Sequence, residues 1–97
     1  MKLCVPNELR EQVAAFIHAK GLPWHVVDDG SCDIRVAQAG DATRRESRTD
    51  TLEAGGWIRC ATAWGMAQKH GLRLADLGAF LNALDIKVRH CSLGCFE

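Results

Sequence analysis

Residues 60–84, CATAWGMAQKHGLRLADLGAFLNAL, carry the pattern of two packed helices joined by a tight turn. Within them, Ala67, Gly71 and Leu77 stand at the spacing A-x-x-x-G-x-x-x-x-x-L. The small Ala67 lets two helices approach closely, Gly71 suits a left-handed turn between them, and Leu77 packs the second helix onto the first. The pattern therefore predicts a helix-turn-helix.

The residues around this spacing indicate the bounds of the helix pair and of its neighbours. We expect one helix over residues 61–70 and a second over residues 75–84, in which Phe80 faces inward. Residues 57–59 before the helices and residues 86–90 after them alternate like short strands of a half-buried sheet.

The N-terminal part of the chain predicts a helix followed by a β-hairpin. Asn7 is the expected N-cap of a helix that ends at Lys20, because a glycine follows Lys20. Residues 24–27 and 32–37 have the pattern of two strands joined by a turn at residues 28–31. With the helix pair, this hairpin indicates an α+β protein.

These expectations divide the chain into three segments. Residues 1–38 form a helix–hairpin subdomain, residues 39–56 a charged loop or linker, and residues 57–97 a helix-turn-helix half with a cysteine-bearing tail. Residues 40–50 hold almost nothing apolar, which is typical of a solvated loop. The chain is one compact domain if the hairpin packs on the helix pair.

Composition and charge narrow the classes of function. The 97 residues suffice for one domain, and 12 Lys and Arg balance 12 Asp and Glu. Neither half of the chain is basic, which weakens a nucleic-acid hypothesis, because phosphate neutralisation supplies most non-specific affinity. There is no signal peptide and no apolar run of about 20 residues, so we expect a cytoplasmic protein without a membrane partner. No nucleophile, base and pocket combine into a catalytic arrangement, so we do not expect an enzyme.

Residues 57–91 resemble winged helix-turn-helix domains, such as the N-terminal domains of ModE-like and MarR-like regulators. The resemblance covers about a third of the chain and rests on the three positions of the helix-turn-helix spacing and on Phe80. It implies a winged-helix-like half with short flanking strands. Residues 84–96 also look like the end of small uncharacterised domains of anaerobic prokaryotes.

The outward face of the second helix bears on the kind of partner. A helix that reads DNA usually presents Arg, Lys, Asn, Gln, Ser or Thr to the bases. Here small and acidic residues occupy that face, and only Asn82 suits a base contact, with Arg73 before the helix as a phosphate contact. The leading hypothesis is a small intracellular, non-enzymatic binding or regulatory module that uses this surface for a protein partner.

Two other classes of function stay open. A DNA-binding regulator would act as a homodimer and would use further arginines for phosphate contacts, namely Arg44, Arg45, Arg48, Arg73 and Arg89. A thiol-based metal or electron carrier would use the cysteines of the tail.

The five cysteines are an odd number, so they cannot all pair within the chain. Cys91 and Cys95, next to His90, have ligand types that suit zinc or an iron–sulfur cluster, with Cys60 or Cys32 as a further ligand. If the strands that flank the helices pair antiparallel, Cys60 and Cys91 lie on the order of 13 Å apart, and a shared site requires the tail to fold back. Alternatively, the two tail cysteines form a switchable disulfide or are structural, without any cofactor, and Cys60 is a reactive thiol at a helix N-terminus or a buried filler.

Metal content distinguishes these hypotheses for the tail. The chain is purified without oxygen beside the Cys91→Ser/Cys95→Ser variant, and zinc, iron and the visible spectrum are measured. Stoichiometric metal that is lost in the variant identifies a metal site. Metal-free, colourless wild-type protein leaves the structural and redox hypotheses.

Overall fold

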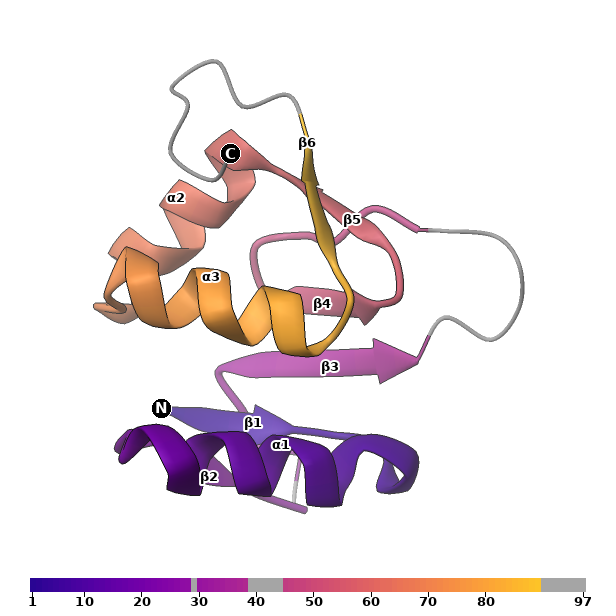
Figure 1. The fold of residues 1–97 in the computed structure, drawn as a ribbon, viewed down its shortest axis with the longest axis vertical. Helices are drawn as coiled ribbons and strands as arrows, with labels where there is room; N and C mark the ends of the chain where they lie inside the picture. Colours follow the sequence, from indigo (N-terminus) through magenta and orange to yellow (C-terminus); the bar gives the residue numbers. More distant parts are fainter. Residues whose placement is uncertain (29, 39–44, 90–97) are drawn as a thin grey trace.

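Four parallel strands form one of two sheets in the computed structural model, which describes residues 1–28, 30–38 and 45–89. Their order is β2-β1-β3-β4 (Figure 1). Their bounds are Lys2–Cys4 for β1, His25–Val26 for β2, Ile34–Gln38 for β3 and Thr51–Ala54 for β4. Helix α1 (Asn7–Lys20) connects β1 to β2. The described residues thus form a mixed α/β fold with a parallel sheet, which is compatible with the α+β class expected.

The second sheet has two strands, and the helix pair connects them. The elements are β5 (Trp57–Arg59), α2 (Cys60–His70), α3 (Leu74–Ala83) and β6 (Lys87–Arg89). β5 and β6 run parallel, with Arg59 opposite Arg89, so the antiparallel pairing considered above is wrong. The reason is that α2 and α3 return the chain to the start of β5, where the Gly55 N–H donates to the Leu84 carbonyl at 2.9 Å.

The helices lie close to their expected bounds because their ends have clear signals. Gly71 follows α2 with a φ of 65°, and its N–H donates to the Ala67 carbonyl. Such a left-handed residue satisfies a carbonyl that the helix leaves open. α1 ends at Lys20 as expected, although its N-cap is Pro6 and Asn7 is its first helical residue.

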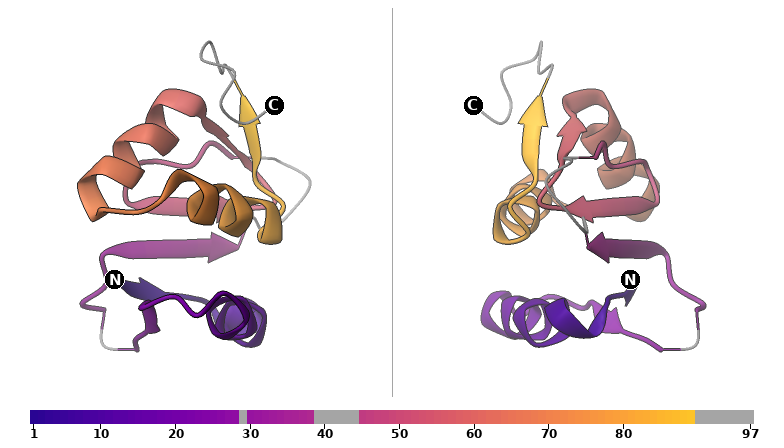
Figure 2. Two further views of the ribbon diagram at one scale, coloured as in Figure 1. Left: turned by 60° about the vertical axis from the view of Figure 1, so that its left-hand side comes forward. Right: turned by 90° about the vertical axis from the view of Figure 1, so that its right-hand side faces the viewer.

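Helices α1 and α3 lie on the same face of the four-stranded sheet (Figures 1 and 2). Three aromatic rings join them: Phe16 of α1, Trp24 just before β2 and Phe80 of α3. The Phe80 ring centroid lies 5.3 Å from that of Phe16 and 5.3 Å from that of Trp24. Beside the rings, the Gln12 side chain donates to the Ala83 carbonyl. One hydrophobic core therefore extends from the sheet to the helix pair.

The expected β-hairpin is wrong. β2 and β3 do not pair with each other, because β1 lies between them and pairs parallel with both. Leu3 of β1 is opposite Val26 on one side and Ile34 on the other, and it is fully buried. The turn at residues 28–31 predicts direct pairing of β2 with β3. Instead β1, a three-residue strand with a fully buried leucine, lies between them.

The expected loop over residues 39–56 is wrong in its C-terminal part. Residues 51–54 form β4, which pairs with β3, and both Leu52 and Ala54 are buried. Ser47 is also buried, and its hydroxyl accepts a hydrogen bond from the Glu53 N–H at 2.9 Å. Two alternating apolar residues suffice for a strand here because β3 supplies the pairing partner.

Gly56 marks a close approach of two backbone segments just before β5. A Cβ atom at this position would clash with the Arg45 carbonyl oxygen and would lie 3.0 Å from the Glu53 carbonyl oxygen. The Gly56 carbonyl also accepts from the Lys87 N–H at 3.0 Å. Only glycine fits between these groups, and its carbonyl accepts the hydrogen bond from the first residue of β6.

Two Gly→Ala substitutions should therefore have opposite effects on stability. Gly56→Ala is expected to lower the free energy of unfolding by about 1–3 kcal/mol, as overpacking does. Gly65→Ala, in an exposed position of α2 with no atom near the added Cβ, is expected to raise it by about 0.5–1 kcal/mol. Urea unfolding of the two variants and the wild type measures both effects. Equal shifts in one direction would contradict the close approach at Gly56.

Candidate functional site

The helix-turn-helix positions of the sequence pattern lie in the core. Ala67, Leu77 and Phe80 are buried where α2 and α3 meet the sheet, and Gly71 forms the turn between the helices. These side chains hold α3 in place and are not available to a partner. The surface that they position is the opposite side of α3.

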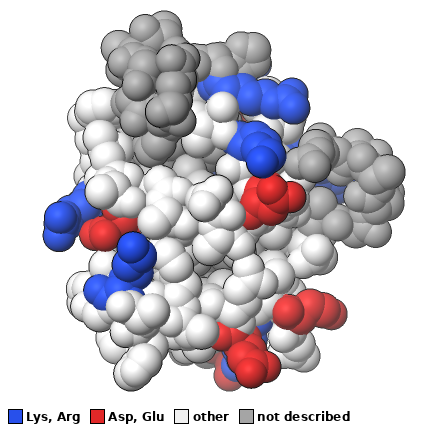
Figure 3. Space-filling view, viewed as in Figure 1, with Lys and Arg blue, Asp and Glu red and all other residues white. Residues whose placement is uncertain are grey.

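A groove of about 390 Å³ runs between the exposed side of α3 and β6. Its lining residues are Gly78, Leu81, Asn82, Ile86, Lys87 and Val88. Leu81 and Ile86 are buried, Val88 is half-buried, and Asn82 and Lys87 are exposed. Figure 3 shows this face of the molecule, with Lys and Arg side chains and an acidic side chain below them in the region of β6, beside a mostly uncharged surface over α3. The groove thus combines an apolar floor with an exposed rim at Lys87, whose ammonium lies 3.5 Å from the Asp85 carboxylate.

One edge of β6 is open within the part of the chain that the structure describes. β6 pairs only with β5 there, and the Lys87 N–H points toward β5, since it donates to the Gly56 carbonyl. Backbone groups of successive strand residues point to opposite sides. The N–H and carbonyl of Val88 therefore face away from β5, along the groove.

A second cluster gathers around Trp57 on β5. The guanidinium carbons of Arg59 and Arg89 lie 5.8 and 5.6 Å from the Trp57 ring centroid, within the range of a cation–π interaction. Arg59 also forms an ion pair with Glu46 at 2.9 Å. The Arg45 carbonyl accepts from the Trp57 N–H at 3.0 Å, so the segment before β4 lies beside this cluster. The side chain of Arg89 has no acidic partner among the described residues.

The residues expected to contact nucleic acid come from several separate elements. Arg73 lies at the start of α3 with its side chain 83% exposed, 3.8 Å from Asp76. Asn82 lies near the other end of this helix, and ten residues of α-helix span about 15 Å. Arg48 lies with Arg45 in a separate depression, and Arg44 falls outside the described residues.

The tail site expected from sequence also falls outside the described residues, since it includes His90, Cys91 and Cys95. Cys60 is 2% exposed as the first residue of α2, whose N-cap is Arg59. In the described ranges, no three His, Cys, Asp or Glu side chains come close enough to hold a metal ion. The parallel β5–β6 register removes the antiparallel geometry from which the separation of Cys60 and Cys91 was calculated.

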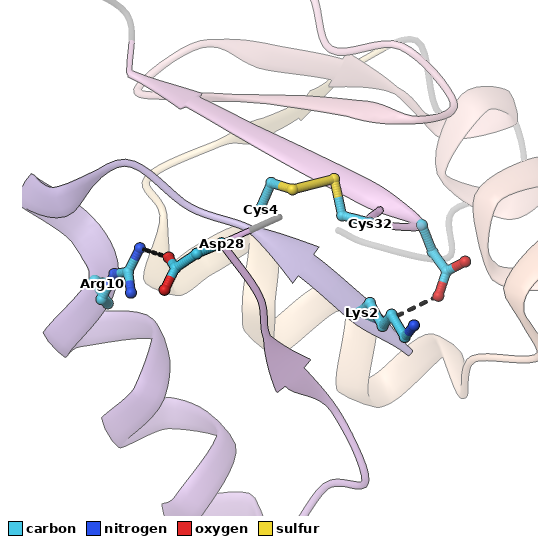
Figure 4. Close-up of a disulfide and its surroundings, with 6 residues drawn as sticks. Lys2, Cys4, Arg10, Asp28 and Cys32 are labelled. Atoms are coloured by element: carbon cyan, nitrogen blue, oxygen red, sulfur yellow. Dashed lines mark hydrogen bonds and ion pairs between the residues drawn. A yellow bond between two sulfur atoms is a disulfide. The ribbon is translucent and has the colours of Figure 1, made fainter. Parts of the chain in front are cut away.

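The structure joins Cys4 and Cys32 in a disulfide, a pairing that the sequence did not indicate (Figure 4). Cys4 ends β1, and Cys32 lies in the connection between β2 and β3. Nearby, Arg10 of α1 forms an ion pair with Asp28 (Figure 4). The hydrogen bond to Asp28 raises the pKa of Arg10 above its usual value.

A surface ion pair connects α2 with the residue that precedes β4. Both Asp50 carboxylate oxygens accept from the Lys69 ammonium at 2.9 Å. This hydrogen bond, with a smaller effect of His70, lowers the pKa of Asp50 below its usual value. The pair is exposed, so it contributes little to stability, and it lies outside the groove residues.

Asn82 lies on the exposed side of α3 and β6 lies close to the expected last strand, whereas no single sequence motif predicts the groove between them. The partial signal in the sequence is the alternation of Ile86, Lys87 and Val88, with two apolar residues on one side of the strand. No family model, no curated protein and no solved structure matches the chain. Within the described residues, no helix has the length and apolar character needed to cross a bilayer.

Proposed function

We propose that this chain is a non-enzymatic protein-binding module that receives an extended segment of its partner along β6. The observation that carries this proposal is the outward-facing backbone of Val88 at the open edge of β6, directly beside the α3–β6 groove. An open strand edge can pair with an added strand, whose backbone hydrogen bonds give affinity while neighbouring pockets give specificity.

The lining of the groove specifies the chemistry of that segment. Successive side chains of a strand alternate between two sides. On one side they meet the apolar floor formed by Leu81, Ile86 and Val88, and on the other they meet the exposed Lys87 and Arg89. A segment in which Val or Ile alternates with Glu or Asp satisfies both sides.

The exposed side of α3 supports the same proposal. Gly78 lets a partner backbone approach the helix closely, and Asn82 offers a donor and an acceptor at the rim. Small, uncharged residues next to buried apolar ones are better suited to a protein segment than to a phosphate backbone, which requires clustered positive charge.

The tail cysteines would act next to this site. Cys91 follows the last residue of β6 by two positions in the sequence. Metal binding or oxidation at Cys91 and Cys95 would therefore tune the strand that receives the partner, as the sequence hypothesis of a regulatory module requires.

The proposal is tested by blocking the edge of β6 at one atom. Val88→Pro removes the outward N–H and keeps the β5–β6 hydrogen bonds, because proline is tolerated on an edge strand when its nitrogen faces solvent. A fluorescein-labelled peptide of alternating Val and Glu is expected to bind the wild type and to lose about threefold to tenfold in affinity to Val88→Pro, since one backbone hydrogen bond is lost. Fluorescence anisotropy measures the binding.

The matched control is Val88→Ala, which removes side-chain contact but keeps the N–H. Val88→Ala should lower the affinity for the peptide less than Val88→Pro does. The far-UV circular dichroism spectra of both variants should match that of the wild type. Equal binding to wild type and Val88→Pro would refute strand addition. Sedimentation of the free chain tests whether β6 instead pairs with a second copy.

A second candidate function is nucleic-acid binding at the Trp57 cluster. The observation in its favour is the pair of guanidinium groups from Arg59 and Arg89 beside the Trp57 ring. Arginine and aromatic rings together suit a phosphate backbone with stacked bases. The net charge of zero and the ion pair between Arg59 and Glu46 both oppose binding to phosphates, so peptide binding in the groove is the better supported function.

Salt dependence tests the nucleic-acid candidate. If labelled single-stranded or duplex DNA binds, Arg89→Gln should reduce the slope of log Kobs against log salt by about 1, because one phosphate contact is lost. Arg73→Gln, at the opposite end of α3 from β6, is the matched control and should leave the slope unchanged. Absence of binding at low salt would exclude this function.

A further inference from the structure

The Cys4–Cys32 disulfide joins two segments that differ in exposure. Cys4 ends β1, in the centre of the sheet, and is 8% exposed. Cys32 lies outside regular structure and is half-buried. Their Cα atoms are 5.6 Å apart, which is an ordinary disulfide separation. An incoming reagent therefore has better access to the sulfur of Cys32 than to that of Cys4.

The charges around the two sulfurs also differ. Arg35 is the register partner of Cys4 in the parallel β1–β3 pair, so both side chains project from the same face of the sheet. Cys4 and Arg35 both line a cavity of about 290 Å³. The Arg35 side chain has no ion-pair partner among the described residues, whereas Arg10 in the same cavity is paired with Asp28.

The other cysteine has an acidic neighbour in the sequence. Asp33 follows Cys32 directly in the chain, and its carboxylate accepts from the Lys2 N–H at 2.9 Å, which fixes it beside β1. Positive charge stabilises a thiolate, and negative charge destabilises it. Arg35 therefore favours Cys4 as the leaving thiolate, because the Asp28 carboxylate in the same cavity is already paired with Arg10.

We propose that Cys4–Cys32 is an exchange site for low-molecular-weight thiols, with Cys32 as the sulfur that is attacked. An incoming thiolate forms a bond to Cys32 Sγ, the Cys4–Cys32 bond breaks, and its electron pair leaves on Cys4 Sγ as a thiolate. A second thiolate then attacks the outer sulfur of the mixed disulfide. This step releases the oxidised thiol dimer and leaves Cys32 as a thiolate, so two incoming thiolates are oxidised as one disulfide is reduced.

Trapping the first step tests the direction of attack. The oxidised chain is mixed with reduced glutathione, quenched with iodoacetamide and mapped by mass spectrometry of its peptides. Glutathione should appear on Cys32 at least about tenfold more often than on Cys4, and the same molecules should carry the alkyl group on Cys4. The proposal is overturned by equal labelling of both sulfurs, by exchange that begins only when the chain unfolds, or by an oxidised chain without the Cys4–Cys32 bond.

Charge variants separate an exchange site from a merely structural disulfide. Arg35→Gln should slow the exchange several-fold, because the leaving thiolate loses its positive neighbour, and Asp33→Asn should lessen the preference for Cys32. Arg35 is exposed, so its substitution should leave the unfolding midpoint of the oxidised chain unchanged. An exchange rate that neither variant changes would overturn the role of charge and, with it, the proposed direction.

Discussion

The contact of Phe80 with Phe16 and Trp24 is the interaction on which the arrangement of this protein depends. Phe80 belongs to α3, Phe16 to α1, and Trp24 precedes β2, so a single buried ring of the C-terminal half contacts two segments of the N-terminal half. Aromatic rings at such distances contribute by burial and by the geometry of their edges and faces. Because one side of α3 is committed to this contact, its other side is left for the groove along β6.

The disulfide and the groove lie near different sheets of the molecule. The four-stranded sheet contains the disulfide and its charged neighbours at the ends of β1 and β3, whereas the two-stranded sheet contains the groove edge and the Trp57 cluster. Gly56 lies where the chain passes from one sheet to the other. Its carbonyl accepts a hydrogen bond from the Lys87 N–H, so the close packing at this glycine fixes the place where β6 begins.

Helices were predicted well from the sequence because their signals are local. A period near 3.6 residues and the stops at Gly21 and Gly71 are contained in the segments themselves. The expected strand at residues 57–59 is confirmed as β5, but the pairing of the strands was predicted wrongly because pairing is not local. β2 has two residues, too few to reveal a partner or a direction, and β4 lies next to a charged stretch. For the site, exposed Asn82 and the last strand were found, but the pairing of Cys4 with Cys32 depends on the sheet order, which no local pattern contains.

The parallel pairing of β5 with β6 has a consequence for the order in which the protein folds. The two strands are joined through both helices, so their pairing closes a long loop, whereas contacts between α2 and α3 are local. Loop-closure entropy makes such non-local pairing late and local contacts early. The wall of the groove is thus expected to form after the local contacts between α2 and α3, as the β1–β3 pair, which closes a loop of similar length, is expected to follow α1. The open edge of β6 is therefore in place only when the loop through both helices has closed.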